Sequence, residues 1–379
     1  MKFVHLSDLH IGKRVHEYSM IEDQRYILTK IINIIDEIKA QGVIIAGDIY
    51  DKPVPPAEAV QLFDDFLYRL SKRNLQVFII SGNHDSAERI AFASRLIEQS
   101  GVHLSPVYNG EVTPVTLTDE HGEIDVYMLP FIKPQHVRKL FEEETISSYT
   151  DAIRVAVENM NIDTDKRNIL ITHQFVTGST RCDSEDVSVG GTDNVDGSVF
   201  SDFDYVALGH IHSPQNCGSE KIRYCGTPLK YSFSEAKHQK SVTVVNFLEK
   251  GNMEISTIPL VPLRDLKEIK GKYEEIMSRD FYSGTTYQDD YMSIILTDEE
   301  EVYNALSNLR VVYKNLMKIE YDNKRTRQNN AVVEAVDVEK ESPLKLFSDF
   351  YELQNNQALS DEQTEFMENL IEKIWEEQL

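Results

Sequence analysis

The chain has 379 residues, of which 41% are hydrophobic and 27% are charged, proportions typical of a globular protein with a buried core. This length predicts two or three domains. The sequence contains no run of about 18 apolar residues, and its first residues lack the basic start and cleavage site of a signal peptide, so we expect neither a membrane span nor secretion.

Three cysteines, Cys182, Cys217 and Cys225, form no C-x-x-C pair, which argues against a disulfide framework and against a thiolate zinc site. Reduced thiols are typical of the cytoplasm, and we therefore expect a cytoplasmic protein.

The net charge of −24 argues by itself against nucleic-acid binding, since phosphate contacts need Lys and Arg. The charge is uneven, however. Residues 341–379 hold ten acidic and two basic residues, whereas residues 309–327 hold six basic and two acidic residues. The overall charge therefore leaves the substrate open, and the basic stretch fits either a solvated surface or a phosphate-contact surface.

Strand and helix patterns alternate over residues 1–260. An apolar run at FVHLSD is followed by Ser19-x-x-Glu22, a capping box that predicts a helix through Ala40. After it come the strand VIIAGD, a helix over residues 56–74, the strand VFIISGNHD and a helix over residues 87–100. This βαβα order predicts a largely parallel sheet.

Further strands are predicted at residues 112–117, 124–129, 168–172, 205–208, 222–225, 242–247 and 253–258. A single open sheet with short connections cannot hold so many strands. We therefore predict an α/β fold in which two packed β-sheets are flanked by helices.

The rest of the chain predicts two smaller parts. Residues 261–266 are typical of a linker, and residues 267–325 of a small α+β unit. Its expected elements are helices at 268–277 and 300–308 and strands at 291–296 and 317–321. After a polar connection at residues 328–342, Ser342-Pro343 and Ser360-x-x-Gln363 predict two short amphipathic helices. Such helices pack either on their own domain or in a partner's groove.

Five of the predicted strands end in residue types that bind metal ions. These residues are Asp8, His10, Asp48, Asn83, His84, Asp85, His173, His210 and His212. In a parallel sheet the ligand site lies outside the carboxyl ends of the strands, so we expect these residues to meet at one edge. Any one of the motifs alone is more often an ordinary turn or surface feature, but five at successive strand ends predict a metal site.

The residue types fit two divalent cations. Imidazoles favour transition metals such as manganese, iron and zinc, and carboxylates favour manganese and magnesium. In extended backbone, the spacing of Asp8 with His10, and of His210 with His212, turns both side chains of a pair the same way. Asp48 has two oxygens and can bridge two ions, and metals about 3.5–4 Å apart clamp the attacking and leaving oxygens of a phosphoryl transfer.

Six histidines lie outside these motifs. We interpret them as ordinary core or surface residues: His5, His16, His103, His121, His136 and His238.

Together these motifs resemble the calcineurin-like metallophosphoesterases. The shared patterns are Asp-x-His, GDxxD, GNHD, a histidine at a strand end and GHxH. The flanking sequence looks like the SbcD subfamily of bacterial nuclease subunits, on the segments HLSDLHIGK, GDIYDKPVPP, SGNHDS, VGGTDNVDGSVF, FDYVALGHIHSPQ and IRYCGTPLKYSFSE. The resemblance covers residues 1–260 by sequence and the remainder by layout.

The resemblance implies a four-layer αββα catalytic domain that holds two manganese ions. One ion would be bound by Asp8, His10, Asp48 and His212, and the other by Asp48, Asn83, His173 and His210. His84 matches the family's catalytic histidine, which is not a metal ligand. Asp51 stands where archaeal relatives have a histidine, and it is expected to orient His84. Asp85 is a second candidate for orienting the histidines.

The resemblance also implies a function and partners. We expect a manganese-dependent DNA nuclease, with double-strand exonuclease and single-strand or hairpin endonuclease activity. It would act in DNA end processing, repair and recombination, as a homodimer and with the coiled-coil ATPase SbcC. The implied domains are a nuclease domain at 1–262, a capping and DNA-contact domain at 263–328, and a linker with helices at 329–379, of which residues 341–379 would bind the ATPase.

Two alternatives remain open. The chain could be another phosphoesterase of the same family that acts on a small phosphoester or a phosphoprotein. It could also be a non-catalytic scaffold, although such proteins usually lose metal ligands and this sequence lacks none of them. An iron site of the purple acid phosphatase type is disfavoured, because its tyrosine ligand should lie three residues after Asp48, where this chain has Asp51.

Overall fold

A computed structural model describes residues 1–185, 193–324 and 326, together with scattered single positions between 344 and 370. The two amphipathic helices that the sequence predicts after residue 341 therefore lie largely outside the described residues, and they stay predictions.

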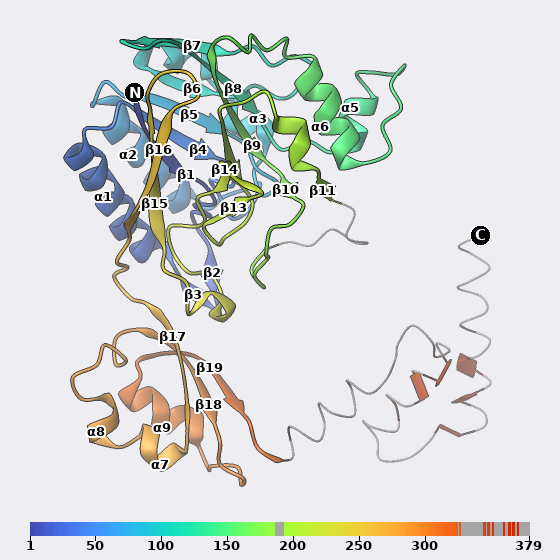
Figure 1. The fold of residues 1–379 in the computed structure, drawn as a ribbon. Helices are drawn as coiled ribbons and strands as arrows, with labels where there is room; N and C mark the ends of the chain where they lie inside the picture. The colour runs from blue at the N-terminus through green and yellow to red at the C-terminus, as the bar shows by residue number, and fades with distance from the viewer. Residues whose placement is uncertain are drawn as a thin grey trace. The chain divides into compact units, whose positions relative to one another are not determined.

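Two six-stranded sheets dominate the structure (Figure 1). The first has the order β16-β15-β1-β4-β5-β6 and the second the order β13-β14-β12-β9-β8-β7. The strands of the first sheet are β1 (Lys2–Leu6), β4 (Gly42–Ala46), β5 (Gln76–Ile80), β6 (Val102–Leu104), β15 (Ser241–Phe247) and β16 (Met253–Pro259). Those of the second sheet are β7 (Val115–Asp119), β8 (Gly122–Leu129), β9 (Arg167–His173), β12 (Tyr205–Gly209), β13 (Gln215–Cys217) and β14 (Ser219–Tyr224).

The central strands of each sheet are parallel, and the antiparallel strands lie at the edges. In the first sheet β1, β4, β5 and β6 run parallel, and β15 and β16 complete it in antiparallel pairs. In the second sheet β8, β9, β12 and β14 run parallel. The carboxyl ends of the central strands therefore gather at one edge of each sheet, where ligand sites form.

The innermost strands β1, β4, β5, β9 and β12 are buried on both faces, as expected where helices cover a parallel sheet. In β4, Val43 and Ile45 pack in the cluster that includes α1 (Ile21–Ile38) and α2 (Ala57–Ser71), while Ile44 and Ala46 face the second sheet. On the outer side of the second sheet lie α5 (Pro134–Arg138) and α6 (Tyr149–Glu158). The result is the predicted αββα order of layers.

Two helix predictions are wrong in detail. Ser19 does not cap α1, which begins after Met20 without a side-chain cap; Ser19 belongs to β3 (Tyr18–Ser19), which pairs with β2 (Arg14–Val15). The helix predicted over residues 87–100 is broken into α3 (Ala87–Ile90), α4 (Ser94–Ile97) and a 3₁₀ turn η1 (Glu98–Ser100). Ala93, with φ of 62°, adopts a left-handed conformation that an α-helix cannot contain.

Residues beyond 265 form a small sheet in the order β17-β18-β19. Its elements are β17 (Leu266–Gly271), α7 (Tyr273–Ile276), α8 (Arg279–Tyr282), β18 (Tyr291–Leu296), α9 (Ala305–Val312) and β19 (Asn315–Tyr321). The helix predicted at 268–277 is therefore wrong, because its first half is a strand. The predicted strands at 291–296 and 317–321 are confirmed.

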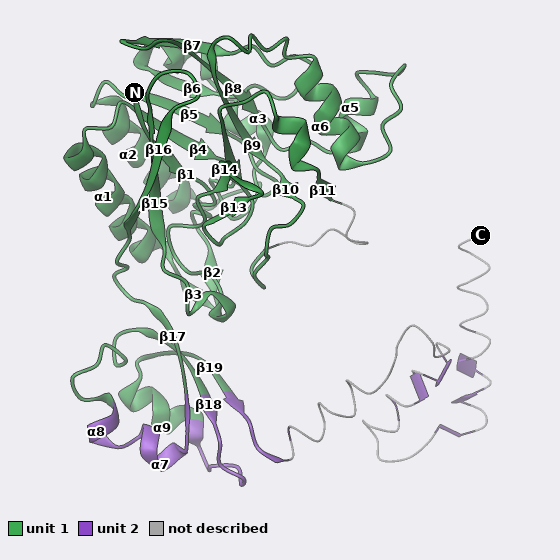
Figure 2. Ribbon diagram, in the orientation of Figure 1, with its two compact units in different colours: residues 1–269, 282–294, 306–319 green, residues 270–281, 295–305, 320–379 purple. Residues whose placement is uncertain are grey.

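The chain separates into two compact units that interleave along the sequence (Figure 2). One comprises residues 1–269, 282–294 and 306–319, and the other comprises residues 270–281, 295–305 and 320–379. The domain boundaries expected from the sequence, at 262 and 328, stay predictions.

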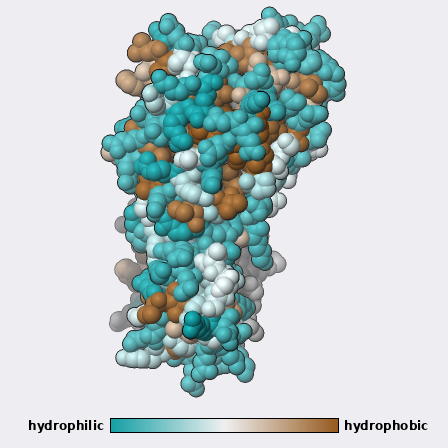
Figure 3. Space-filling view, turned by 90° about the vertical axis from the view of Figure 1, so that its left-hand side faces the viewer, coloured by the Kyte–Doolittle hydropathy of each residue, from teal (hydrophilic) through white to brown (hydrophobic). Residues whose placement is uncertain are grey.

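Smaller elements complete the described chain: β10 (Phe175–Val176), β11 (Asn194–Val195), η2 (Gly197–Phe200) and η3 (Phe233–Glu235). The three cysteines are free thiols. Within the described parts of the chain, we find no helix with the length and apolar character needed to cross a bilayer. The face of the molecule in Figure 3 is mainly hydrophilic, with apolar residues in small groups.

Candidate metal centre

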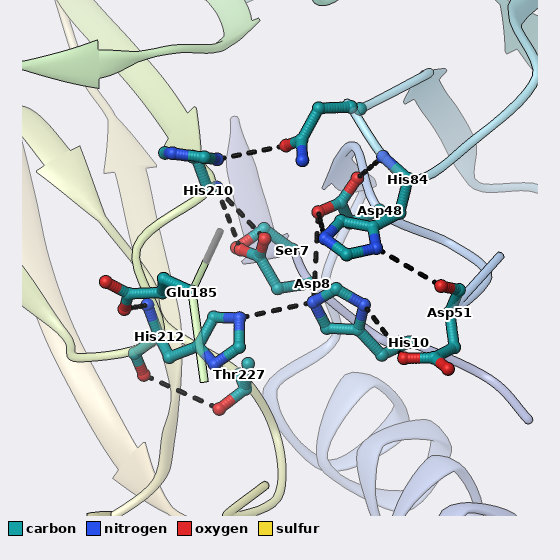
Figure 4. Close-up of polar contacts among 12 residues, drawn as sticks. Ser7, Asp8, His10, Asp48, Asp51, His84, Glu185, His210, His212 and Thr227 are labelled. Atoms are coloured by element: carbon teal, nitrogen blue, oxygen red, sulfur yellow. Dashed lines mark hydrogen bonds and ion pairs between the residues drawn. The ribbon is translucent and has the colours of Figure 1, made fainter. Parts of the chain in front are cut away.

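The predicted site residues come from five loops, each of which follows the carboxyl end of a strand. Asp8 and His10 follow β1, Asp48 follows β4, and Asn83 and His84 follow β5, all in the first sheet. From the second sheet come His173, at the end of β9, and His210 and His212, which follow β12. Figure 4 shows that side chains from both sheets point toward one another. The structure thus brings together residues that are far apart in sequence.

Four of these residues have a backbone that non-glycine residues rarely adopt. The φ angles are 52° at Asp8, 44° at His10, 51° at Asp48 and 99° at His210. Such conformations cost free energy and persist where the surroundings enforce them, often at functional sites. Here the amide of Asp8 donates to the Gly47 carbonyl, and the amide of His10 donates to the Asp48 carbonyl, each at 3.0 Å. The first two loops are therefore held together by their own backbone.

Glycines allow the two sheets to approach closely beside the site. A Cβ atom on Gly47 would lie 2.4 Å from Nδ1 of His173, and one on Gly209 would lie 1.9 Å from the carbonyl oxygen of Ala46. No side chain fits at such distances. The same carbonyl of Ala46 accepts from Nδ1 of His173 at 2.8 Å. Because a carbonyl only accepts, His173 carries its proton on Nδ1 and turns Nε2 toward the other ligands.

The first predicted ligand group comprises Asp8, His10, Asp48 and His212. The Nε2 atoms of His10 and His212 are 3.2 Å apart, and Nε2 of His10 is 3.8 Å from Oδ2 of Asp48. Ligand atoms of Asp8, His10 and His212 all lie within 4.8 Å of one another. All four side chains are buried.

The second predicted group comprises Asp48, Asn83, His173 and His210. Oδ1 of Asn83 is 3.0 Å from Nε2 of His173 and 3.0 Å from Nδ1 of His210. Nε2 of His173 is 3.3 Å from Oδ2 of Asp48. Oδ2 of Asp48 therefore faces imidazoles of both groups, which is the position that a bridging carboxylate would need.

His84 lies at the rim of the two groups. Its side chain is 18% exposed, and its Nε2 is 3.9 Å from Oδ2 of Asp48. Its Nδ1 is 3.1 Å from the backbone carbonyl of Asp51. The carboxylate of Asp51 instead pairs with Lys13 at 2.7 Å and lies 4.0 Å from Nδ1 of His10. The contact that orients His84 thus comes from the main chain of Asp51.

Asp85 holds the backbone, and within the described part of the chain its carboxylate hydrogen-bonds to main-chain amides. Its carboxylate accepts from the amides of Gly82 at 2.9 Å, Tyr50 at 3.0 Å and Ile49 at 3.1 Å. It therefore ties the loop after β5 to the loop after β4. Burial raises the pKa of Asp85 to about 6.

Burial also controls the protonation of the ligand side chains. It lowers the pKa of His10 well below its usual value, that of His210 to about 3, and that of His212 in the same direction. Neutral imidazole is the form that binds metals. Burial raises the pKa of Asp8 to about 8. For His173, burial lowers the pKa, but the nearby carboxylate of Asp48 outweighs this effect and raises it to about 9.

The donor set fits divalent transition metals. The two groups combine imidazole nitrogens, two carboxylates and an amide oxygen, a mixture that suits manganese, iron or zinc better than magnesium. In addition, Nδ1 of His10 is buried without a hydrogen-bond partner among the described residues, although buried polar atoms usually have one. None of the six histidines outside the motifs belongs to these groups in the described structure.

Sequence reasoning missed three residues that contact His212. Oγ of Ser184 is 2.7 Å from Nδ1 of His212, Oε1 of Glu185 accepts from its amide at 2.6 Å, and Oε1 of Glu235 lies 3.6 Å from its Nδ1. These residues follow no predicted strand and match no ligand spacing. The only indication in the sequence was Glu235, which ends the segment IRYCGTPLKYSFSE that resembles the SbcD subfamily.

Comparison with known proteins shows which families the chain resembles. Residues 1–214 match the family model described as calcineurin-like phosphoesterase, and residues 262–355 match the one described as type 5 capsule protein repressor C-terminal domain. The chain is 29% identical to the SbcD subunit of the SbcCD nuclease of Staphylococcus epidermidis, over 99% of both chains. Its identity to the protein of the same name from Staphylococcus saprophyticus is 30%, over 100% of this chain and 99% of the other.

Two solved structures share only a weak overall likeness with the chain. A dimetal phosphatase from Danio rerio is 13% identical, with a TM-score of 0.40, over 69% of this chain and 96% of the other. A protein from Thermus thermophilus is 12% identical, with a TM-score of 0.37, over 68% of this chain and 98% of the other. Scores this low add nothing to the assignment.

The protonation of Asp8 and His173 predicts that metal binding releases protons. A pH of 7 is below the pKa of Asp8, about 8, and below that of His173, about 9, so both side chains hold a proton. Metal ligands must be deprotonated, so the affinity for Mn²⁺ should rise between pH 6 and pH 9 and then level off. Titration calorimetry in buffers of different ionisation enthalpy measures the released protons. Binding without proton release, or with pH-independent affinity, would contradict the assigned protonation.

Proposed function

Because the chain belongs to the calcineurin-like phosphoesterase family, we propose that it is the nuclease subunit of an SbcCD-type complex, a metal-dependent phosphodiester hydrolase that cuts DNA. The observation that carries this proposal is the similarity to SbcD subunits of SbcCD nucleases over the whole chain, together with clusters of possible metal ligands, two of which contain Asp48. We further propose double-strand exonuclease and single-strand or hairpin endonuclease activity in DNA end processing, repair and recombination.

The proposed mechanism assigns a role to each group of side chains. Asp8, His10, Asp48 and His212 would hold one manganese ion, and Asp48, Asn83, His173 and His210 would hold the other. Two such ions supply Lewis acidity and an acidified water for in-line attack on phosphorus. Asp48 keeps the two ligand groups together, and burial keeps the imidazoles of His10 and His210 neutral.

His84 is suited to handle a proton. The carbonyl of Asp51 accepts from its Nδ1, which leaves Nε2 as the nitrogen that takes up or releases a proton on the side of Asp48. A histidine held in this way can donate to a phosphoryl oxygen or protonate the leaving alkoxide. Its partial exposure at the rim gives access to substrate.

The metal assignment predicts which cation restores activity. Protein treated with a chelator should lose its cleavage of linear and hairpin DNA, and Mn²⁺ should restore it better than Mg²⁺. The reason is that magnesium prefers an octahedron of oxygens, whereas both ligand groups contain imidazoles. Gel assays on both substrates measure the recovery. Full activity in excess chelator would overturn the two-metal proposal.

A pair of substitutions separates chemistry from metal binding. His84→Gln should reduce DNA cleavage by about 10²–10⁴-fold, the usual contribution of a general acid, while the protein still binds its metal and DNA. His173→Ala should lose metal as well, because it removes a ligand atom 3.3 Å from Asp48. Elemental analysis of both purified variants gives the metal content. Equal metal loss in the two variants would make His84 a ligand and reverse the role assigned to it.

We propose a homodimer formed through the phosphoesterase domain. Phe92 and Leu96 are separated by four residues in the segment after β5, and they are 78% and 81% exposed. Exposed large apolar side chains close together are typical of contact surfaces. We also propose a cytoplasmic location, because the three cysteines are free thiols.

We propose that residues 263–328 form the capping domain that contacts DNA phosphates. The basic stretch 309–327 supports this role. Lys314 in this stretch pairs with Asp289 at 3.3 Å, with side chains 68% and 78% exposed. A pair so exposed is weak and can exchange for a phosphate.

We propose that residues 341–379 bind the coiled-coil ATPase. Their ten acidic residues make them poor DNA contacts. Their apolar residues recur at helical spacings, and two of them, Phe366 and Leu370, are 66% and 38% exposed. Short amphipathic helices are marginal alone and need a surface to pack on, and an apolar, basic groove of a protein partner would supply it.

Deletion of residues 341–379 tests this proposal. The truncated chain should keep its melting temperature and metal-dependent activity but no longer capture the ATPase in a pull-down. Trp375→Ala or Phe350→Ala should each weaken the association by about 1–4 kcal/mol if the aromatic residues are hot spots. Retained capture would show that the ATPase does not need these residues, and a lower melting temperature of the truncated chain would show that the helices pack on their own protein; either result would defeat the proposal.

A further inference from the structure

His212 is held at three points by polar groups, two of them buried and one, Ser184, partly exposed. Glu185 accepts from its amide at 2.6 Å, Lys240 donates to its carbonyl at 2.8 Å, and Ser184 contacts ring atom Nδ1 at 2.7 Å. The Ser184 hydroxyl continues to Oε1 of Glu235 at 2.6 Å. Glu235 is fully buried and Lys240 is 4% exposed, so the contacts lie in a region that water does not screen.

The direction of these hydrogen bonds fixes the tautomer of His212. A carboxylate only accepts, so Ser184 must give its single proton to Glu235. Oγ of Ser184 can then only accept from Nδ1 of His212, which must carry the proton. The other ring nitrogen, Nε2, keeps its lone pair and faces Nε2 of His10 at 3.2 Å. At 3.6 Å, Glu235 is too far from Nδ1 for a direct hydrogen bond, so Ser184 is the link.

Lys240 keeps Glu235 in the charged form that this arrangement requires. Its Nζ is 2.5 Å from Oε2 of Glu235, and it also donates to Oγ1 of Thr227 at 2.7 Å. A buried carboxylate with this pairing stays an acceptor.

The other ligand histidines do not depend on a side chain in this way. Nδ1 of His173 is held by the carbonyl of Ala46, and Nδ1 of His10 has no partner among the described residues. His210 turns Nδ1 toward Asn83 and the second group. Of these four histidines, His212 is therefore the one whose tautomer is controlled by a carboxylate, that of Glu235, through the hydroxyl of Ser184.

We infer that Glu235 is a positioning residue of the first metal site, which acts through the Ser184 hydroxyl to keep Nε2 of His212 unprotonated and turned toward the metal. The inference rests on the proposed function, because it takes His212 as a ligand. Carboxylates that act on a ligand histidine in this way typically change metal affinity by about 10–100-fold.

Glu235→Gln is the direct test. The new amide at position 235 can donate to Oγ of Ser184. The hydroxyl of Ser184 then donates to Nδ1 of His212 instead of accepting from it. The ring proton of His212 therefore sits on Nε2, where it blocks the metal. We expect one of the two Mn²⁺ sites to weaken by about 10–100-fold, while the other keeps its affinity. Ser184→Ala, which removes the link, should weaken the same site.

Two control variants separate this effect from general damage. Asp125→Asn changes a buried carboxylate near the amino end of β8 that also pairs with a lysine, Lys166 at 3.4 Å, so both sites should keep their affinity. Glu235→Gln with Lys240→Met removes the lysine charge that the single variant leaves unpaired. The double variant should keep the weakened site, because the amide at position 235 still donates to Ser184. A normal site in the double variant would show that the unpaired charge of Lys240, and not the tautomer of His212, weakens the site in Glu235→Gln.

Two measurements read the outcome. Electron paramagnetic resonance of free Mn²⁺ gives the affinity of each site, and ¹⁵N NMR of the histidine rings, assigned with His212→Asn, gives the tautomer without any metal. Two normal sites or an unchanged tautomer in Glu235→Gln would overturn the inference. If the parent protein bound no Mn²⁺, that result would contradict the proposed function and not this inference. The ring tautomer of His212 would still show whether Ser184 connects it to Glu235.

Discussion

The contact between Asp48 and His173 joins the two halves of the catalytic region. Asp48 follows β4 of one sheet and His173 ends β9 of the other, and their polar atoms are 3.3 Å apart. Burying a carboxylate is costly unless it is paired, so this contact fixes how closely the sheets approach. The glycines at 47 and 209 follow from it, since a Cβ atom at either position would collide with the opposite sheet.

The same burial determines the chemistry of the centre. The imidazoles of His10 and His210, which would be partly protonated in water at neutral pH, are kept neutral. The remaining protons are held by Asp8 and His173, while the neighbouring His173 keeps the pKa of Asp48 low and its carboxylate ionised. Such a cluster exchanges protons for divalent cations readily, because cations relieve the repulsion between Asp8 and Asp48. The protein's charge of −24 then matters less than the local charge at the centre, where positive ions and His84 would meet phosphate.

The sequence predicts the central strands and the meeting of the candidate site residues well, for one physical reason. Parallel strands buried on both faces are continuous apolar runs, and their carboxyl ends share an edge, so residues after such runs must meet. The helix starts and helix lengths predicted from local sequence motifs were less accurate. Ser19 looked like a helix cap but pairs in a hairpin, and the helix expected through Ala93 is broken by a left-handed residue. Tertiary contacts decide both cases.

The support around His212 could not be predicted from spacing. Ser184 and Glu235 are 51 residues apart, and neither follows a strand of the two large sheets directly. Their contact exists because the loops after β10 and β14 fold back onto the same histidine. Asp51 shows the same limit, since its backbone and not its carboxylate reaches His84. Side-chain identity points to ligands, whereas the groups that orient them are known only from the fold.

The central claim is that Asp48 joins two metal sites into one centre. Electron paramagnetic resonance of the protein with Mn²⁺ bound measures this directly, because two manganese ions that share a carboxylate are magnetically coupled. We predict two ions per chain with a coupled spectrum, and loss of the coupling in Asp48→Asn. A single ion per chain, or two ions with the spectrum of isolated Mn²⁺, would contradict the account.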